Sequence, residues 1–420
     1  MSEASRRGEE AVRRPGPVQD DGATGEALGR PELTDEEFAA AFGEPVSRVL
    51  DLDTWQPGLD LLGLYGRLER EVREAVRLEE ETVGQVRRSL FPRIRERPGA
   101  PPGAGVYRAG VDEIARVHEG LLLRGAVEAC QGISAVYHTL PISIVQVAVC
   151  LVSYQGDQGA WAQRLYRRDL RLESIATVDE ALELLTRRQG AYAIAGQGRR
   201  DALSELGRRS IMAYAERAAL LHRSHARWRL GHGAPVPLEM VSAAGVPGLV
   251  ERGLEVLEEL IFRQRRFLFV PSAGRRWLLA IGNALAPLEY AILDTISDDL
   301  AQVIAAGQYW GARRGLGARL REFALEAGPQ VVVGLYRASA LAPAQLFYAH
   351  REHAHLAALI ALADSVFQPH RGFPMLLDLA ALVCQSNFGA ETLAAPVQLA
   401  YMGTEGPFRY LRAGAGGPSR

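Results

Sequence analysis

Residues 124–138 read RGAVEACQGISAVYH. The run AVEAC is short, mostly apolar and flanked by glycines, a pattern typical of a β-strand, and we expect this strand to end at Gln131-Gly132. The following run, ISIVQVAVCLVSYQG (142–156), is rich in β-branched residues and predicts a second strand. These two strands open the part of the chain in which strands and helices alternate.

The alternation extends from about residue 107 to about residue 403. Helical spacing of apolar residues predicts helices in VDEIARVHEGLLL (111–123), TVDEALELLTRRQ (177–189), DALSELGRRSIMAYAERAALLHR (201–223), 247–263 and PLEYAILDTISDDLAQVIAAG (287–307). Further strands are predicted in RWRLGHG (227–233), RRFLFVPS (265–272), RRWLLAIG (275–282) and VVVGLYR (331–337), with helices from there to about 403. This order predicts an α/β fold, a mixed sheet with helical insertions.

The two ends of the chain differ from this central part. Residues 1–33 are rich in Gly, Pro, Arg and acidic residues and predict a disordered tail. Residues 34–97 predict an N-terminal helical region with many opposite charges, and the Pro- and Gly-rich residues 98–106 predict a linker. We therefore expect the α/β domain at 107–403 and a flexible tail at 404–420.

The composition is that of a soluble globular protein, with 48% hydrophobic and 23% charged residues. Lys and Arg number 48 against 50 Asp and Glu, a balance that neither requires nor excludes a nucleic-acid partner. Signal-peptide and membrane-spanning runs are absent, so we expect a cytoplasmic protein without a membrane partner. The three cysteines, Cys130, Cys150 and Cys384, are too widely spaced for a zinc ribbon.

Several common catalytic motifs are missing or incomplete. The chain has neither the GxxxxGK[ST] phosphate loop nor the GxSxG elbow of serine hydrolases. In HREHAH (350–355), His350 and His353 have the i,i+3 spacing of metal ligands, but solvated polar positions are the preferred interpretation, also for Glu352 and His355. Cys130, near His138, is better explained as a buried thiol than as a nucleophile.

Acidic residues close to predicted strand ends are the remaining candidates for chemistry. Metal-dependent phosphodiester hydrolysis needs several carboxylates that converge on one or two cations. Glu216 lies in a mostly apolar helix, sixteen residues before His232, and Glu239 follows in PVPLEM. Asp294 and Asp298 would share a helix face at i,i+4 in the predicted helix 287–307, whereas Asp298 and Asp299 are best explained as a solvated face.

The order and spacing of four segments carry a resemblance to a known family. They are Gln131-Gly132, then Glu216, then His232-Gly233, then FPMLLDLAA (373–381) after the strand VVVGLYR. Residues 107–403 thereby resemble NurA, an RNase H-like nuclease that works with the hexameric ATPase HerA in DNA end processing. The resemblance implies an RNase H-like mixed sheet, a homodimer, and HerA-like hexameric ATPase and DNA as partners.

This sequence departs from the family motifs at most positions. The family's two strand-end aspartates correspond to Gln131 and His232, its motif tyrosine to Phe373 and its motif histidine to Ala381, so only Glu216 keeps its type. An amide adds no negative charge to a Mn²⁺ or Mg²⁺ site, although His232 would still bind a softer metal beside Glu216. The resemblance therefore implies Mn²⁺ or Mg²⁺ if the protein is active, and otherwise no cofactor.

Three hypotheses follow. The chain is a NurA-like subunit with an eroded metal-nuclease site, or an active metal-dependent DNA nuclease, or an unrelated α/β interaction protein. In the second case Glu216, Glu239 and His232, with Asp157 or Asp294, would rebuild the catalytic site. Arginines rather than base-reading motifs would contact DNA, and salt bridges on the surface are the competing explanation for them. The candidates are Arg164, Arg167, Arg168, Arg208 and Arg209.

Overall fold

The computed structural model describes residues 34–55, 61–139, 142–156, 159–167, 205–242, 246–272, 281–306, 314–404 and 410–416. Contacts divide the chain into two compact units, Met1–Arg77 and Leu78–Arg420. The division falls inside the predicted helical region rather than in the predicted linker. Among the described residues, no helix combines the length and the apolar character that crossing a bilayer requires.

The first unit is helical where it is described. It contains α1 (Asp35–Phe42), α2 (Val46–Val49), the short 3₁₀ helix η1 (Leu52–Trp55) and the first part of α3 (Leu61–Gln85). The side chain of Thr34 accepts a hydrogen bond from the amide of Glu37 at 3.2 Å, and Glu37 accepts one from the amide of Thr34 at 2.9 Å. This capping box explains why α1 begins where it does.

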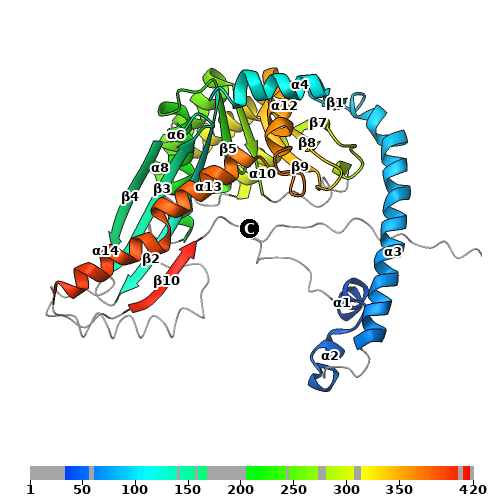
Figure 1. The fold of residues 1–420 in the computed structure, drawn as a ribbon, viewed down its shortest axis with the longest axis horizontal. Coiled ribbons are helices and arrows are strands. Elements are labelled where there is room, and N and C mark those ends of the chain that lie inside the picture. The colour runs from blue at the N-terminus through cyan, green and yellow to red at the C-terminus, as the bar shows by residue number, and fades with distance from the viewer. Residues whose placement is uncertain are drawn as a thin grey trace, which may run out of the picture. The chain divides into compact units, whose positions relative to one another are not determined.

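The second unit contains a ten-stranded sheet with the order β1-β7-β8-β9-β6-β5-β2-β3-β4, in which β10 also pairs with β2 (Figure 1). The strands are β1 (Gly105–Arg108), β2 (Val127–Thr139), β3 (Ser143–Val152), β4 (Gly159–Arg167), β5 (Trp228–His232), β6 (Phe267–Val270), β7 (Glu289–Thr295), β8 (Val331–Arg337), β9 (Gln345–His350) and β10 (Tyr410–Gly416). Strands β2, β3 and β4 pair antiparallel, whereas β5 is parallel to β2 and β6 is parallel to β5. The predicted fold class, an α/β mixed sheet with helical insertions, is confirmed.

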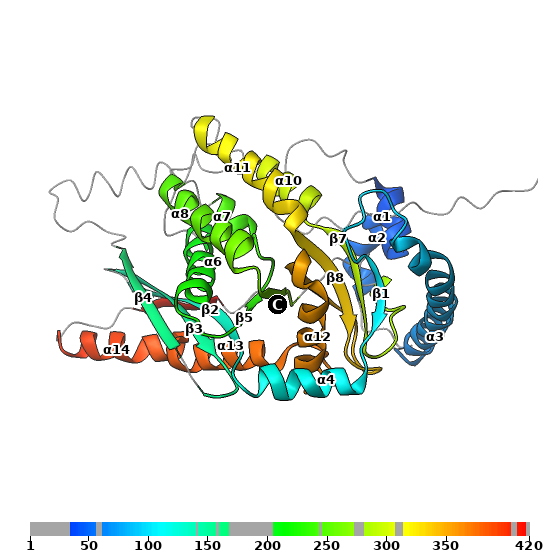
Figure 2. The same cartoon turned by 90° about the horizontal axis from the view of Figure 1, so that it is seen from above.

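Helices cover both faces of the sheet (Figure 2). The helices of this unit after α3 are α4 (Val111–Val117), α6 (Glu205–His222), α7 (Leu238–Ser242), α8 (Pro247–Glu258), α10 (Ser297–Ala306), α11 (Arg314–Ala327), α12 (Ala354–Ser365), α13 (Met375–Phe388) and α14 (Ala390–Met402). Short π and 3₁₀ segments adjoin them: η2 (Val86–Leu90), η3 (Phe91–Ile94), η4 (His118–Leu122), η6 (Glu259–Gln264), η8 (Gly328–Gln330) and η9 (Arg351–His353). One core joins the sheet to α6, α8 and α11, and another joins it to α4, α12 and α13.

The structure corrects several predicted elements. Strand β2 does not end at Gln131-Gly132 but continues to Thr139, because β3 pairs with it along this whole length. The predicted helix 287–307 is a strand, β7, followed by α10, because β1 and β8 hydrogen-bond to its two sides. Asp294 therefore lies on β7 and Asp298 on α10, so they do not share a helix face.

Other differences concern strands that the sequence analysis did not predict. Strands β1 and β9 lie at the predicted linker and in a region predicted to be only helical. Within the predicted flexible tail, Tyr410–Gly416 form β10. The predicted disordered tail 1–33, the predicted helix 177–189 and most of the predicted strand 275–282 lie outside the described residues.

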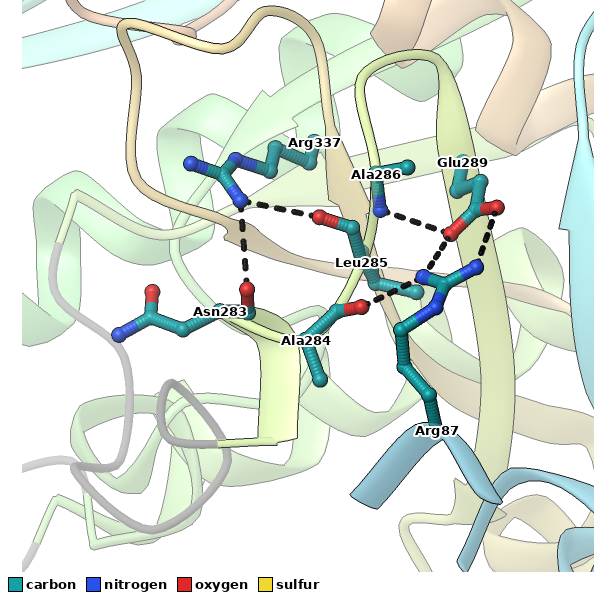
Figure 3. A network of polar contacts seen from close by, with 7 residues as sticks. All are labelled: Arg87, Asn283, Ala284, Leu285, Ala286, Glu289 and Arg337. Carbon is teal, nitrogen blue, oxygen red and sulfur yellow. Dashed lines mark hydrogen bonds and ion pairs between the residues drawn. The ribbon is translucent and has the colours of Figure 1, made fainter. Parts of the chain in front are cut away.

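A polar network fastens η2 to the sheet (Figure 3). The guanidinium of Arg87 contacts both carboxylate oxygens of Glu289 on β7, at 2.8 and 3.1 Å, and donates to the carbonyl of Ala284 at 2.6 Å. Glu289 also accepts from the amide of Ala286 at 2.7 Å. Arg337 donates to the carbonyls of the same turn at Asn283 and Leu285. The turn before β7 is thus held by arginines from two distant segments.

Candidate functional site

The candidate site lies at a gap in the pairing of β2. On one side of this strand, β5 pairs with residues 127–130 and β10 pairs with residues 134–139. Between them, the amide of Gly132 donates a hydrogen bond to Oε1 of Glu216 at 2.7 Å. The carboxylate of a helix residue therefore satisfies a backbone donor that a neighbouring strand would otherwise pair.

Two of the predicted site residues meet at the same place. Cys130 on β2 is in register with Gly231 on the parallel strand β5, so the next residues, Gln131 and His232, occupy adjacent positions. Gln131 is buried, and His232 is the last residue of β5. Gln131 and His232 are thus neighbours in the backbone of adjacent strands, and the Glu216 carboxylate binds the amide of Gly132, the residue after Gln131. Because successive residues of a strand point to opposite faces, the side chain of Gln131 points away from the face on which Gly132 meets α6.

Two glycines make room for the groups around this site. A Cβ atom at Gly132 would lie 2.8 Å from Oε1 of Glu216 and 2.6 Å from Cγ of Met212. A Cβ atom at Gly231 would lie 2.2 Å from the ring of Phe269. Glycine at these positions lets the carboxylate and the ring approach the backbone closely.

Arg217, the ion-pair partner of Glu216, was not predicted from the sequence. Its Nη1 lies 2.9 Å from Oε2 of Glu216, and both side chains are buried, with 3% and 10% of their surface exposed. Arg217 also donates to the carbonyls of Ala213, Ala234 and Pro235 at 3.1, 2.6 and 3.0 Å. Adjacent residues of a helix point in different directions, so the pattern of apolar residues gave no signal for this pair.

Burial governs the protonation of these groups. It raises the pKa of Glu216 above the ordinary value of 4.5, while Arg217 and the amide of Gly132 act in the opposite direction. Burial likewise lowers the pKa of Arg217, and Glu216 offsets part of this shift. The pKa of His232 falls to about 4 because of burial and the nearby charge of Arg217, although Asp378 acts to raise it. His232 is therefore neutral near pH 7.

The segment before α13 and the beginning of that helix complete the surroundings. The ring of Phe373 lies 6.3 Å from the ring of His232, and the guanidinium of Arg371 lies 5.0 Å from the centre of the Phe373 ring. Asp378 accepts a hydrogen bond from Gln368 at 2.7 Å and forms an ion pair with Arg371. The altered motif position Phe373 thus lies beside His232, whereas Ala381, in α13, offers only a methyl group.

The other predicted acids do not complete a metal site here. Glu239 lies on α7 and acts on the charges of Glu216 and Arg217. Asp294 forms an ion pair with Arg97 at 2.6 Å on β7, in a different part of the sheet. Asp157 lies outside the described residues.

The residues of the site do not fit a Mn²⁺ or Mg²⁺ ion. Such ions require hard, mostly anionic oxygen ligands, and the three positions offer only a neutral amide, a neutral imidazole and one carboxylate. That carboxylate already has an arginine as its counter-ion. In the part of the chain that the structure describes, no three His, Cys, Asp or Glu side chains are grouped so that they could hold a metal ion.

The arginines that were predicted to contact DNA lie on β4 and α6 where the structure describes them. Arg164 is exposed on β4 and donates to Gln146 at 2.9 Å, Arg209 pairs with Glu205 at 2.7 Å, and Arg208 is half-buried on α6. Arg167 is the last residue of β4, and Arg168 lies outside the described residues.

The histidines of 350–355 were predicted to be solvated, but the structure buries one of them. His350 is buried, and its Nδ1 accepts a hydrogen bond from the amide of Glu352 at 3.2 Å, whereas His355 lies 3.0 Å from the hydroxyl of Tyr290. Cys130 is fully buried, and burial raises its pKa. His138 lies eight residues along the same strand, about 27 Å away, so the two do not form a catalytic pair.

Comparison with known proteins gives similarities of structure but not of sequence. No family model matches the chain, and no curated protein matches it. Among solved structures, the NurA nuclease from Sulfolobus solfataricus is similar at 10% identity and a TM-score of 0.40, over 81% of this chain and 99% of that one. NurA with manganese is similar at 10% identity and a TM-score of 0.32, over 70% and 96%. NurA bound to dAMP and manganese is similar at 10% identity and a TM-score of 0.30, over 64% and 90%. At these values the comparison assigns no role to any single residue.

Proposed function

We propose that this chain is a NurA-like subunit of a HerA-type DNA end-processing complex, that it binds DNA, and that its metal-nuclease site is eroded. The observation that supports the proposal is that Gln131 and His232 occupy adjacent positions on the parallel strands β2 and β5, while Glu216 accepts a hydrogen bond from the amide of Gly132. Gln131 is far from the other two positions in the sequence, and the motif order alone led us to expect all three close together. Their side-chain types are those of a nuclease site that has lost two carboxylates.

The alternative of a working nuclease has less support. A rebuilt site would need further carboxylates near Glu216, and Glu239 alone among the described candidates lies within its electrostatic range. Asp294 is engaged with Arg97 elsewhere on the sheet. The cation at Glu216 is an arginine rather than a group that activates water. The third hypothesis, an unrelated interaction protein, gives no reason for the adjacent positions of Gln131 and His232.

We infer that DNA contacts would come from the arginines on β4 and α6. Arg164 is exposed on β4, the strand at one end of the sheet order, and Arg209 is exposed on α6 although it forms an ion pair with Glu205. Exposed ion pairs of this kind are weak, so a phosphate would compete with Glu205 at little cost. Arginine suits such contacts because its planar guanidinium binds phosphate through two hydrogen bonds.

A homodimer is part of the proposal. Exposed apolar side chains recur at helical spacing on α3, namely Tyr65, Leu68, Val72 and Val76, each exposed by 49–62%. Leu382 on α13 and Leu399 and Met402 on α14 are 61%, 67% and 77% exposed. Apolar surfaces of this kind are typical of protein–protein contacts. A light-scattering mass of one chain at micromolar concentration would contradict this part.

The function is tested with the full chain and a labelled DNA duplex in an anisotropy titration. We expect binding that weakens steeply between about 50 and 200 mM salt, because phosphate contacts release counterions. Arg164→Glu should weaken binding, whereas Arg252→Glu, at an exposed arginine on α8, should not. Binding that is absent or independent of salt would remove DNA from the proposal.

The partner is tested separately. The HerA-type ATPase of the same organism and the full chain should elute together from a size-exclusion column, in a complex larger than either alone. Two separate peaks at micromolar concentrations would contradict the proposed complex. This result does not depend on metal or on cleavage, so it also distinguishes the eroded-site proposal from the unrelated interaction protein.

A further inference from the structure

We propose that Arg217 is a built-in cation that takes the place of the metal ion at Glu216 and closes this site to divalent metals. The inference rests on the proposed function, in which the metal site has lost ligands, and it names the group that replaces the metal. It assigns Arg217 a positioning role, since the guanidinium fixes the carboxylate that bonds to β2.

Both oxygens of the Glu216 carboxylate are engaged by the protein itself. Oε1 accepts from the amide of Gly132 at 2.7 Å, and Oε2 lies 2.9 Å from Nη1 of Arg217. A divalent ion would need at least one of these oxygens as an anionic ligand. Binding it would break a buried, charge-assisted hydrogen bond.

Arg217 is buried and held by contacts with three parts of the fold. Its side chain is 3% exposed, and the carbonyls of Ala213, Ala234 and Pro235 accept from its three nitrogens. Its guanidinium also lies 5.3 Å from the centre of the Phe269 ring, a cation–π contact. These contacts come from α6, from the segment after β5 and from β6, so the arginine cannot leave without disturbing all three.

The positive charge of Arg217 also opposes a metal ion at this site. A second cation within ~4 Å of a buried guanidinium is strongly repelled, because the protein interior screens charge far less than water does. Arginine keeps its proton at any working pH, so this repulsion cannot be removed by deprotonation. Aspartates at positions 131 and 232 would add anionic ligands but would leave the positive charge in place. Restoring the family's carboxylates is therefore not sufficient to restore metal binding.

The stability test is a double-mutant cycle on the ion pair, measured by urea unfolding. Arg217→Met should lower the equilibrium constant for folding about 100-fold or more, because it leaves a buried carboxylate without its counter-ion. Glu216→Gln combined with Arg217→Met should recover at least tenfold of that loss, since no unpaired charge remains. A double variant as unstable as the sum of the single variants would overturn the role of Arg217 as a counter-ion.

The metal test uses Mn²⁺ alone, followed by calorimetry and by the shift in Tm. Wild type and the double variant Gln131→Asp/His232→Asp should both show no saturable binding at about 1 mM Mn²⁺. This concentration is well above the dissociation constants of dedicated metal sites. Adding Arg217→Met to these two changes should give binding at least tenfold tighter, with a rise in Tm as the metal replaces the lost cation. The matched control adds Arg229→Met instead, because Arg229 is a half-buried arginine that donates to the carbonyls of Leu220, Ser224 and Ala226.

Several outcomes would overturn the inference. One is equal Mn²⁺ binding by the double aspartate variant and by the triple variant with Arg217→Met. Another is Mn²⁺ binding by wild type that Glu216→Gln abolishes, and this measurement decides the matter even if the triple variant does not fold. If wild type binds neither DNA nor the ATPase, the proposed function is contradicted. The metal-binding measurements still test the role of Arg217 in that case.

Discussion

Glu216 and Gly132 are joined by a 2.7 Å hydrogen bond that ties α6 to β2 between the stretches paired with β5 and β10. The bond uses one carboxylate oxygen, and Arg217 uses the other. In a metal nuclease such a carboxylate would hold a cation that activates water. Here the carboxylate binds the backbone of β2 and an arginine, so Glu216 has a structural role.

The close approach at Gly132 predicts a specific sensitivity to substitution. Gly132→Ala would place a methyl group 2.8 Å from the Glu216 carboxylate and 2.6 Å from Met212, so the α6 side chains must shift. We expect a loss of about 1–3 kcal/mol in the free energy of unfolding. Gly248→Ala on α8 is the matched control, because its Cβ would meet no atom within 4 Å. Equal stability of the two variants would show that the Glu216 contact is not tightly packed.

The network of Figure 3 predicts a loss of stability that depends on pH. Burial acts to raise the pKa of Glu289, but Arg87 and the amide of Ala286 outweigh it and hold the pKa below 4.5. The stabilisation is therefore present above about pH 4.5 and lost as the pH falls through the lower, folded-state pKa. Arg87→Met should cost about 1–3 kcal/mol at neutral pH, discounted because Arg87 is partly exposed, and less in acid.

The control for this prediction is Arg252→Met. Arg252 forms an ion pair with Glu255, and both side chains are largely exposed, so the change should be close to neutral. Urea unfolding at several pH values measures both variants. A constant cost of Arg87→Met from neutral pH down to the acid limit of folding would contradict the assigned ion pair.

His232 predicts a further loss of stability in acid. Its pKa is about 4 in the folded protein and 6.5 ordinarily, so the unfolded chain binds more protons between these values. The free energy of unfolding should therefore fall as the pH decreases from about 6.5 to 4, with His232 contributing on the order of 1–3 kcal/mol. His232→Gln should flatten part of this slope, although not all, because the pKa of His350 is also about 4. An unchanged slope in His232→Gln would place the acid sensitivity elsewhere.

The activity prediction follows from the donor set. With Gln131, a neutral His232 and an arginine at Glu216, we expect the isolated protein to show little or no DNA cleavage with Mg²⁺ or Mn²⁺. The measurement is the release of labelled nucleotides from linear DNA at both metals, with Glu216→Ala as the comparison. Robust cleavage that Glu216→Ala leaves intact would show that a catalytic site lies elsewhere in the chain.

The sequence by itself determined the order of the elements around the site. Strand β3, helix α6 and strand β5 follow from β-branched runs and helical periodicity, which are local properties. The spacing from Gln131 through Glu216 to His232 was readable for the same reason. The structure of segment 287–307 could not be predicted in this way. Its apolar spacing suits a helix, but β1 and β8 hydrogen-bond to its first half, which is therefore a strand. Pairing partners far along the chain overrode the local pattern there.

Only the tertiary structure decided what surrounds Glu216. Arg217 follows it directly, yet adjacent helix residues do not ordinarily face one another. The carbonyls of Ala234 and Pro235 and the ring of Phe269 turn the guanidinium back toward the carboxylate. Those groups come from the segment after β5 and from β6, which reach α6 only once the sheet has formed. The local pattern therefore predicted the elements that carry Glu216 and His232, and long-range packing decided which groups surround the Glu216 carboxylate.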